Sequence, residues 1–190
     1  MEKFILNNII IFDTEYTAWE GSQERNWSEE DEYKEIVQIA AIKIIDGKIV
    51  DEFDILIKPK INSYLSDYFT NLTGISNEDM TNSIDFEDGV NKFRKFCGDF
   101  DVYAYGSDYN IIVDNFKLYN IPSDEILKWK KNNYDIRNYF ESKNIDTSKF
   151  SSGTIYQITG KTFEDFSQHN ALWDSKSVFY AIKYLESKIL

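Results

Sequence analysis

Two long apolar runs, Ile36–Ile45 and Ile49–Ile57, follow each other with a short polar break at Asp46-Gly47. Glycine accepts the positive φ of a tight hairpin turn, so this arrangement predicts two antiparallel strands joined at that dipeptide. An earlier β-branched run becomes polar at Asp13, which predicts a buried strand, Ile9–Phe12, that ends there. Three strands are therefore expected in the first third of the chain.

The rest of the chain changes to a helical period. Apolar residues recur at helical spacing in two segments, at Phe86, Val90, Phe93 and Cys97, and at Val178, Ile182, Leu185 and Ile189. Between them we expect a strand at Asp101–Tyr105, a helix marked by Ile112, Phe116 and Tyr119, and a short strand near Tyr134–Ile136. Early hairpin strands followed by alternating strands and helices predict an α/β fold, a mixed sheet with helices packed on it.

Length and composition narrow the class of protein. The 190 residues contain no Pro-, Gly- or Ser-rich linker, so we expect one domain over residues 1–190. The single cysteine, Cys97, cannot form an internal disulfide, which favours a cytoplasmic setting. No apolar stretch approaches the roughly 20 residues of a membrane span. The net charge is -12, which taken alone argues against a polyanionic partner.

Asp13 and Glu15 stand two residues apart at the end of the first predicted strand. In extended backbone such side chains point to the same side of the sheet, which is a geometry that can bind a metal ion. Two acids at the end of a strand are more often a solvated edge, so this pair alone is weak evidence.

Asp108 follows the strand that ends near Tyr105-Gly106, where a carboxylate can reach the same crevice as the first pair. Asp114 is its rival for that position. Six residues further along the same helix, Asp114 is rotated by about 240° from Asp108, so both cannot face one site. We therefore choose Asp108, and we expect Asp114 on a solvated helix face.

The only histidine, His169, precedes Asp174 by five residues. Five positions along a helix would separate the two side chains by roughly 140°. We therefore expect His169 in the loop before the last helix and Asp174 inside its first turns, so that both face one crevice. A histidine beside an aspartate is by itself more often a surface hydrogen bond than a catalytic pair.

The combination of these acids and the histidine resembles the three motifs of the DEDD exonuclease superfamily in its histidine-bearing branch, DEDDh, which includes RNase T and DnaQ-like proofreading exonucleases. The motifs are Ile11–Trp19, Tyr105–Asp108 and His169–Asp174, with supporting matches at Glu35–Ala41 and Leu72–Ile75. The resemblance covers essentially the whole chain and looks nearest to small stand-alone bacterial, KapD-like exonucleases. Related enzymes often place the second-motif aspartate one residue farther from the glycine, and many carry glycine where Ala40 stands.

The resemblance implies an RNase H-like mixed sheet of about five strands, the first three antiparallel and the later ones parallel, flanked by helices. It also implies metal-dependent 3′–5′ hydrolysis that releases nucleoside 5′-monophosphates from single-stranded or short nucleic acid with a free 3′ end. Two Mg²⁺ or Mn²⁺ ions would be held by Asp13, Glu15 and Asp174, with Asp108 binding directly or through water. His169 would be the general base.

Substrate contacts are expected from two parts of the chain. Tyr16, Thr17 and Trp19 come directly after the two acids of the first motif and are placed to bind the terminal nucleotide, although Trp19 would equally fit the core. Residues 126–149 hold six basic and three acidic residues, including Lys128 and Arg137 beside aromatic residues. This stretch fits a single-strand track and a solvated helix equally well.

Two other functions share this pattern of residues. One is a non-catalytic module that keeps the fold to bind nucleic acid or a protein, which would have no need of all five chemical residues. The other is a proofreading subunit that docks on a polymerase and uses the same chemistry. The sequence leaves DNA and RNA open as substrates, because that choice depends on contacts to the 2′-position.

Overall fold

A five-stranded sheet with the order β3-β2-β1-β4-β5 forms the centre of the molecule. The computed structural model describes residues 8–122, 133–162 and 169–188. The strands are β1 (Ile9–Tyr16), β2 (Ile36–Ile45), β3 (Lys48–Leu56), β4 (Asp101–Ala104) and β5 (Asn133–Asp135). The first three pair antiparallel, whereas β4 pairs parallel to β1 and β5 parallel to β4. The mixed sheet predicted from the sequence is confirmed.

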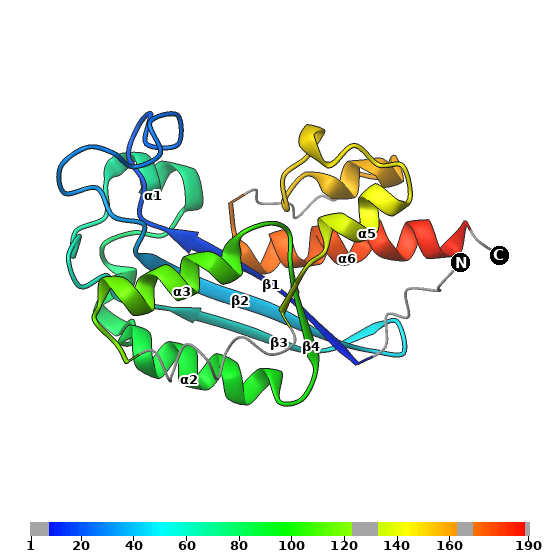
Figure 1. Ribbon diagram of the computed structural model, residues 1–190, viewed down its shortest axis with the longest axis horizontal. Coiled ribbons are helices and arrows are strands. Elements are labelled where there is room, and N and C mark those ends of the chain that lie inside the picture. The colour runs from blue at the N-terminus through cyan, green and yellow to red at the C-terminus, as the bar shows by residue number, and fades with distance from the viewer. Residues whose placement is uncertain (1–7, 123–132, 163–168, 189–190) are drawn as a thin grey trace.

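Helices cover both faces of this sheet (Figure 1). The described α-helices are α1 (Asp67–Thr73), α2 (Phe86–Cys97), α3 (Asp108–Leu118), α5 (Arg137–Ser142) and α6 (Ala171–Ser187), and the 3-10 helices are η1 (Asp79–Asn82), η2 (Thr147–Lys149) and η3 (Ile155–Thr159). Helices α2 and α3 lie on one face and α6 lies on the other. None of these helices is long and apolar enough to cross a membrane.

The β2–β3 hairpin has the predicted turn. Asp46 has a φ of 50° and Gly47 a φ of 71°, so both turn residues adopt the left-handed conformation that matches the twist of the strands. The first strand is longer than predicted, because it continues past Asp13 to Tyr16. Pairing with β2 continues at Asp13↔Ala40 and Glu15↔Gln38, so the backbone stays extended where the sequence becomes polar.

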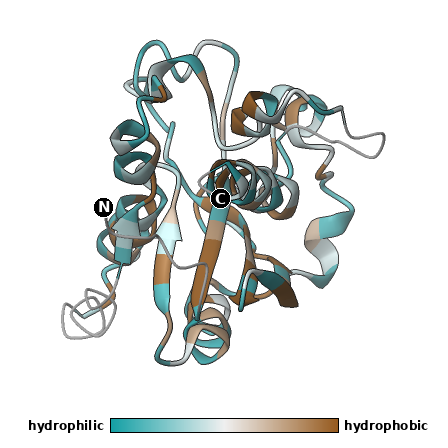
Figure 2. Ribbon diagram, turned by 90° about the vertical axis from the view of Figure 1, so that its right-hand side faces the viewer, coloured by the Kyte–Doolittle hydropathy of each residue, from teal (hydrophilic) through white to brown (hydrophobic). Residues whose placement is uncertain are grey.

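Strand β1 is buried on both faces and divides the core in two. Ile10 and Phe12 belong to the core cluster under α2 and α3. Ile9 and Ile11 belong to the cluster under α6. Figure 2 shows hydrophobic residues concentrated on the strands between the two helical layers. By the same alternation, Asp13 and Glu15 continue the series that faces α6.

The loop between β1 and β2 is held by the buried carboxylate of Glu35. It accepts hydrogen bonds from the backbone N–H groups of Lys60, Ile61 and Asn62 at 2.5–2.8 Å. The Tyr119 hydroxyl donates a fourth, at 2.7 Å. Such charge-assisted bonds are the strong kind, so this residue fixes where the loop meets the sheet.

We expect Glu35→Gln to lower the free energy of unfolding by about 2–4 kcal/mol, because the amide turns a donor toward buried backbone donors. The measurement is urea unfolding of the variant beside Tyr119→Phe. Tyr119→Phe removes one of the four bonds and should cost about 1–2 kcal/mol. Equal stability of Glu35→Gln and the wild type would show that the carboxylate does not anchor the loop.

Candidate active site

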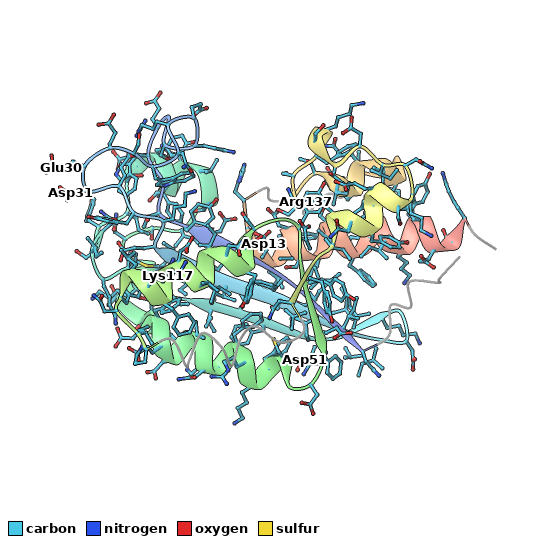
Figure 3. All side chains as sticks on the ribbon, in the orientation of Figure 1. Asp13, Glu30, Asp31, Asp51, Lys117 and Arg137 are labelled. Atoms are coloured by element: carbon cyan, nitrogen blue, oxygen red, sulfur yellow. The ribbon has the colours of Figure 1, made fainter. Side chains whose placement is uncertain are left out.

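A pocket of about 390 Å³ opens at the carboxyl end of β1. Its walls come from the β1–β2 loop, α1, the β4–α3 turn, the start of α5, the segment before η3 and the start of α6. Figure 3 shows Asp13 inside the molecule, whereas Glu30 and Asp31 of the loop lie at its outer edge. The negative charges of these two loop residues therefore lie away from the pocket.

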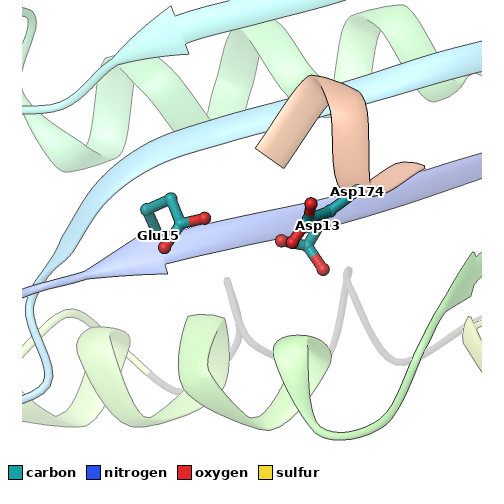
Figure 4. Close-up of side chains that lie close together, drawn as sticks. All are labelled: Asp13, Glu15 and Asp174. Carbon is teal, nitrogen blue, oxygen red and sulfur yellow. The ribbon is translucent and has the colours of Figure 1, made fainter. Parts of the chain in front are cut away.

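Asp13, Glu15 and Asp174 each offer one carboxylate oxygen to a group in which these atoms lie within 4.8 Å of one another. Two of them extend from β1 and the third from the first turns of α6 (Figure 4). Strand alternation explains the arrangement, because these two β1 side chains are on the face that α6 covers. The structure thus brings together three of the four predicted metal ligands.

Asp108 lies in the same pocket but outside that group of three. It begins α3, and its Oδ1 accepts hydrogen bonds from the backbone N–H of Thr14 at 3.1 Å and from the Thr14 hydroxyl at 2.7 Å. Strand β4 pairs with β1 only as far as Phe12, so Asp108 bonds a backbone amide beyond that pairing. Asp114 is exposed and paired with Lys117, as expected.

The segment before η3 contributes contacts that the sequence did not indicate. The Ser152 hydroxyl donates to Asp174 Oδ2 at 3.2 Å. A Cβ added to Gly153 would lie 2.5 Å from Asp174 Oδ1. That oxygen is buried and has no hydrogen-bond partner among the described residues. A buried carboxylate oxygen left unpaired in this way is costly, and a cation would satisfy it.

His169 lies in the loop immediately before α6, as expected, and its side chain lines the pocket. Its φ of 59° places it in the left-handed region. Burial lowers the pKa of the imidazole below its ordinary value of 6.5. The side chain is therefore neutral at pH 7, which is the form that can accept a proton.

Burial raises the pKa of Asp13 well above its ordinary value, and the charges of Asp108, Asp174 and Glu15 raise it further. Burial also raises the pKa of Glu15. It raises the pKa of Asp174 to about 7, although the Ser152 hydroxyl opposes the shift, and that of Asp108 to about 6, against the hydrogen bonds from Thr14. The four carboxylates repel one another, so a divalent cation would lower the free energy of their ionised form.

The predicted substrate contacts lie in different surroundings. Tyr16 lines the pocket, with its ring 5.5 Å from that of Trp27, which also lines it. Thr17 is buried, and its hydroxyl donates to the carbonyl of Tyr33 and accepts from the backbone N–H of Glu35. Trp19 is half-buried and does not line the pocket. The long loop that carries Trp27 is thus part of the site.

Comparison with known proteins identifies the family. The model of the RNase T family, described as an exonuclease, matches residues 10–181. The chain belongs to this exonuclease family. Asp13, Glu15 and Asp174 form an acidic cluster, able to hold a metal ion, in the pocket of this exonuclease domain.

Curated relatives of this exonuclease include much longer proteins. The PolC-type DNA polymerase III of Staphylococcus haemolyticus is 24% identical over 173 residues, which cover 90% of this chain and 11% of the polymerase. The PolC-type polymerase of Streptococcus sanguinis is 32% identical over 92 residues, 47% of this chain and 6% of the polymerase. The exonuclease thus spans only a small part of these polymerases.

Solved structures share the fold of the exonuclease. The nuclease domain of 3′hExo, a DEDDh family member bound to rAMP, has a TM-score of 0.75 at 21% identity, covering 98% of this chain and 95% of that one. Exonuclease X, solved with 5′-overhanging duplex DNA, has a TM-score of 0.62 at 17% identity, covering 96% and 93%. At these identities the likeness is one of fold.

We expect Asp13→Asn to stabilise the exonuclease at pH 8 in the absence of divalent ions, by about 1–3 kcal/mol or about 3–9 °C in Tm. The pKa of the Asp13 carboxyl is higher in the folded protein than in the unfolded chain, so the unfolded chain ionises at lower pH. The wild type therefore loses stability as the pH rises from about 4 through the folded-state pKa. The gain should therefore shrink at pH 5. Thermal unfolding in chelator across this pH range measures it.

Asp114→Asn is the matched control, because its side chain is 61% exposed and should give no pH-dependent difference from the wild type. Added Mg²⁺ should stabilise the wild type more than Asp13→Asn. A stability difference that stays constant from pH 5 to pH 8 would contradict mutual repulsion among the buried carboxylates.

Proposed function

We propose that this exonuclease uses two divalent ions, Mg²⁺ or Mn²⁺, to release nucleoside 5′-monophosphates one at a time from the 3′ end of single-stranded or short nucleic acid. The observation that carries the proposal is the convergence of Asp13, Glu15 and Asp174 with a buried, unpaired oxygen on Asp174. A set of carboxylate oxygens without a sulfur or imidazole among them suits these hard cations rather than zinc.

In the proposed site, Asp13, Glu15 and Asp174 hold the ions directly, and Asp108 binds the second ion directly or through water. When bound, the two ions activate the attacking water and stabilise the leaving 3′-oxygen. The Ser152 hydroxyl orients the carboxylate of Asp174 by donating to its Oδ2, which leaves Oδ1 for a cation. Thr14 orients Asp108 in the same manner.

His169 is the proposed general base. It lines the pocket that contains the carboxylates, and burial keeps its imidazole neutral at pH 7. Its Nδ1 or Nε2 then accepts a proton from the attacking water. His169 lies in the loop that leads into α6, and Asp174 lies in the first turns of that helix, so the two groups come from one short stretch of the chain.

The terminal nucleoside is proposed to bind at the end of the pocket that faces α1. This end is lined by aromatic and apolar side chains, Tyr16, Trp27, Tyr68, Phe69 and Leu72. Bases of any kind stack on such surfaces, so the wall selects for a free end rather than for a sequence. Thr17 and Trp19, which follow Tyr16 along the chain, are part of the same proposal, although neither lines the pocket.

We propose that residues 1–190 form one exonuclease domain of the KapD-like kind. The likeness to the PolC-type polymerases favours a second candidate, a proofreading activity within or beside a polymerase. Both candidates share the chemistry. They differ in substrate, since a proofreading exonuclease prefers a mispaired 3′ end on a primed template.

We expect cleavage to depend strictly on divalent ions. The pocket carboxylates repel one another unless a cation is bound, and the bound cations would position the attacking water. The measurement uses 5′-labelled single strands of DNA and RNA and primed templates with a mispaired end, in Mg²⁺, Mn²⁺ or excess chelator. A ladder that shortens from the 3′ end only with metal supports the proposal. Undiminished turnover in chelator, or products released from the 5′ end, would refute it.

We expect His169→Asn to lower kcat about 10²–10⁴-fold, the usual worth of a general base, while metal binding by calorimetry is unchanged. Asparagine is chosen because it tolerates the positive φ of this position, which alanine does not. His169→Gly is the matched control for backbone strain and should show the same loss. If either variant lost metal affinity, His169 would have to be assigned as a ligand.

A further inference from the structure

Arg137 is the only lysine or arginine among the described residues that line the catalytic pocket. It begins α5, directly after β5, and its side chain is 43% exposed. The pocket otherwise contains four carboxylates, so a single guanidinium there strongly affects where a polyanion can lie. In the sequence, Arg137 belongs to the basic stretch 126–149, which fits a nucleic-acid track and a solvated helix equally well.

The guanidinium is held rigidly by Asp135 at the end of β5. Its Nε donates to Asp135 Oδ1 at 3.1 Å and to Oδ2 at 2.9 Å, and its Nη2 donates to Oδ2 at 2.6 Å. Asp135 Oδ1 also accepts from the backbone N–H groups of Gly106 and Arg137. This carboxylate is therefore fixed by two elements, and it fixes the plane of the guanidinium in turn.

One edge of the guanidinium remains available. Nη1 has no hydrogen-bond partner among the described residues, and the group lies against Gly106, where a Cβ would be 3.5 Å from Arg137 Cζ. Guanidinium N–H groups that are already oriented lose little entropy when they bind an oxyanion. The arrangement suits a phosphate oxygen approaching from the pocket.

The position of Arg137 relative to the metal-binding carboxylates decides which phosphate it would meet. Helix α1 packs on the β2 side of the sheet, where Phe69 shares a core cluster with Val37. Arg137 follows β5 at the opposite edge, and β1 with Asp13 lies between them. Figure 3 shows Arg137 apart from Asp13, above and to the right of it, beside α5.

We propose that Arg137, oriented by Asp135, binds the phosphate that precedes the scissile one, on the 5′ side of the cleaved bond. This inference rests on the proposed function, because the terminal nucleoside then lies against the α1 wall and the scissile phosphate at the carboxylates. The strand leaves the pocket past β4 and β5. Arg137 thus supplies one backbone contact, local to the 3′ end, and favours substrates of at least three nucleotides.

The test compares kcat/KM for a dinucleotide, which has only the scissile phosphate, with that for a trinucleotide, which has one more. Thymidine or uridine series are used, whichever the wild type cleaves faster. Arg137→Ala should lose about 10–100-fold on the trinucleotide, the worth of a charged hydrogen-bonded contact, and less than about 3-fold on the dinucleotide. The slope of log kcat/KM against log salt on the trinucleotide should become shallower by about 0.7.

Lys117→Ala is the matched control, because it also removes a cation paired with an aspartate, on α3 outside the pocket. Lys117→Ala should change kcat/KM for either substrate by no more than about 2-fold, as expected of an exposed ion pair. Arg137→Lys keeps the charge without the planar fork and should recover only part of the loss on the trinucleotide. It also provides the comparison if Arg137→Ala does not fold.

Equal losses on both substrates, or no loss on either, would overturn the assignment of Arg137 to the preceding phosphate. Failure of the proposed function is a different result, since the wild type would then cleave neither substrate in Mg²⁺ or Mn²⁺. Normal cleavage by the wild type together with equal losses in Arg137→Ala would leave the exonuclease activity established and remove only this contact.

Discussion

Repulsion among the four carboxylates of the pocket is the constraint on which the rest of the structure depends. Charges of one sign gathered in a poorly solvated pocket disfavour folding unless other contacts hold them in place. The central position of β1 provides that hold, since Asp13 and Glu15 sit on a strand that is paired with β2 along its whole length. Helix α6, packed on the same face of the sheet, adds Asp174. The pairing of β1 and the packing of α6 thus stabilise an otherwise unfavourable arrangement of charges that can bind a cation.

The acidic residues of the chain have different roles. Glu35 is a structural acid, surrounded by backbone donors, and it keeps the β1–β2 loop against the sheet. Glu30 and Asp31 are solvated. Asp135 aligns a guanidinium. Among the described residues, Asp13, Glu15 and Asp174 are the acids grouped closely enough to share a metal ion, so a net charge of -12 does not describe the surface that a nucleic acid meets. A short substrate end, bound by cations and aromatic rings, is compatible with such a chain.

Periodicity predicted the parts of the structure that depend on long regular elements. The sheet, α2, α3 and α6, and the choice of Asp108 over Asp114, all follow from periods of two and 3.6 residues. Short helices were not predicted: α1, for example, has seven residues and is defined by its caps at Ser66 and Gly74 rather than by a repeating pattern. Ser152 and the Asp135–Arg137 pair also escaped. Their importance comes from tertiary contacts with α6 and with the β4–α3 turn, which no local pattern encodes. Residues 123–132, which carry the predicted Lys128, lie outside the described residues.

Gly153 shows what a glycine can mean when its backbone needs no special conformation. Its φ is not among the positive values, so any residue type would fit the backbone there. The constraint is instead one of space, since a methyl group would lie 2.5 Å from Asp174 Oδ1 and clash with it. The glycine therefore leaves room for the Asp174 carboxylate in the position that the active site requires. Selection at this position would act on the shape of the metal site, and a substitution could abolish catalysis in a chain whose secondary structure is intact.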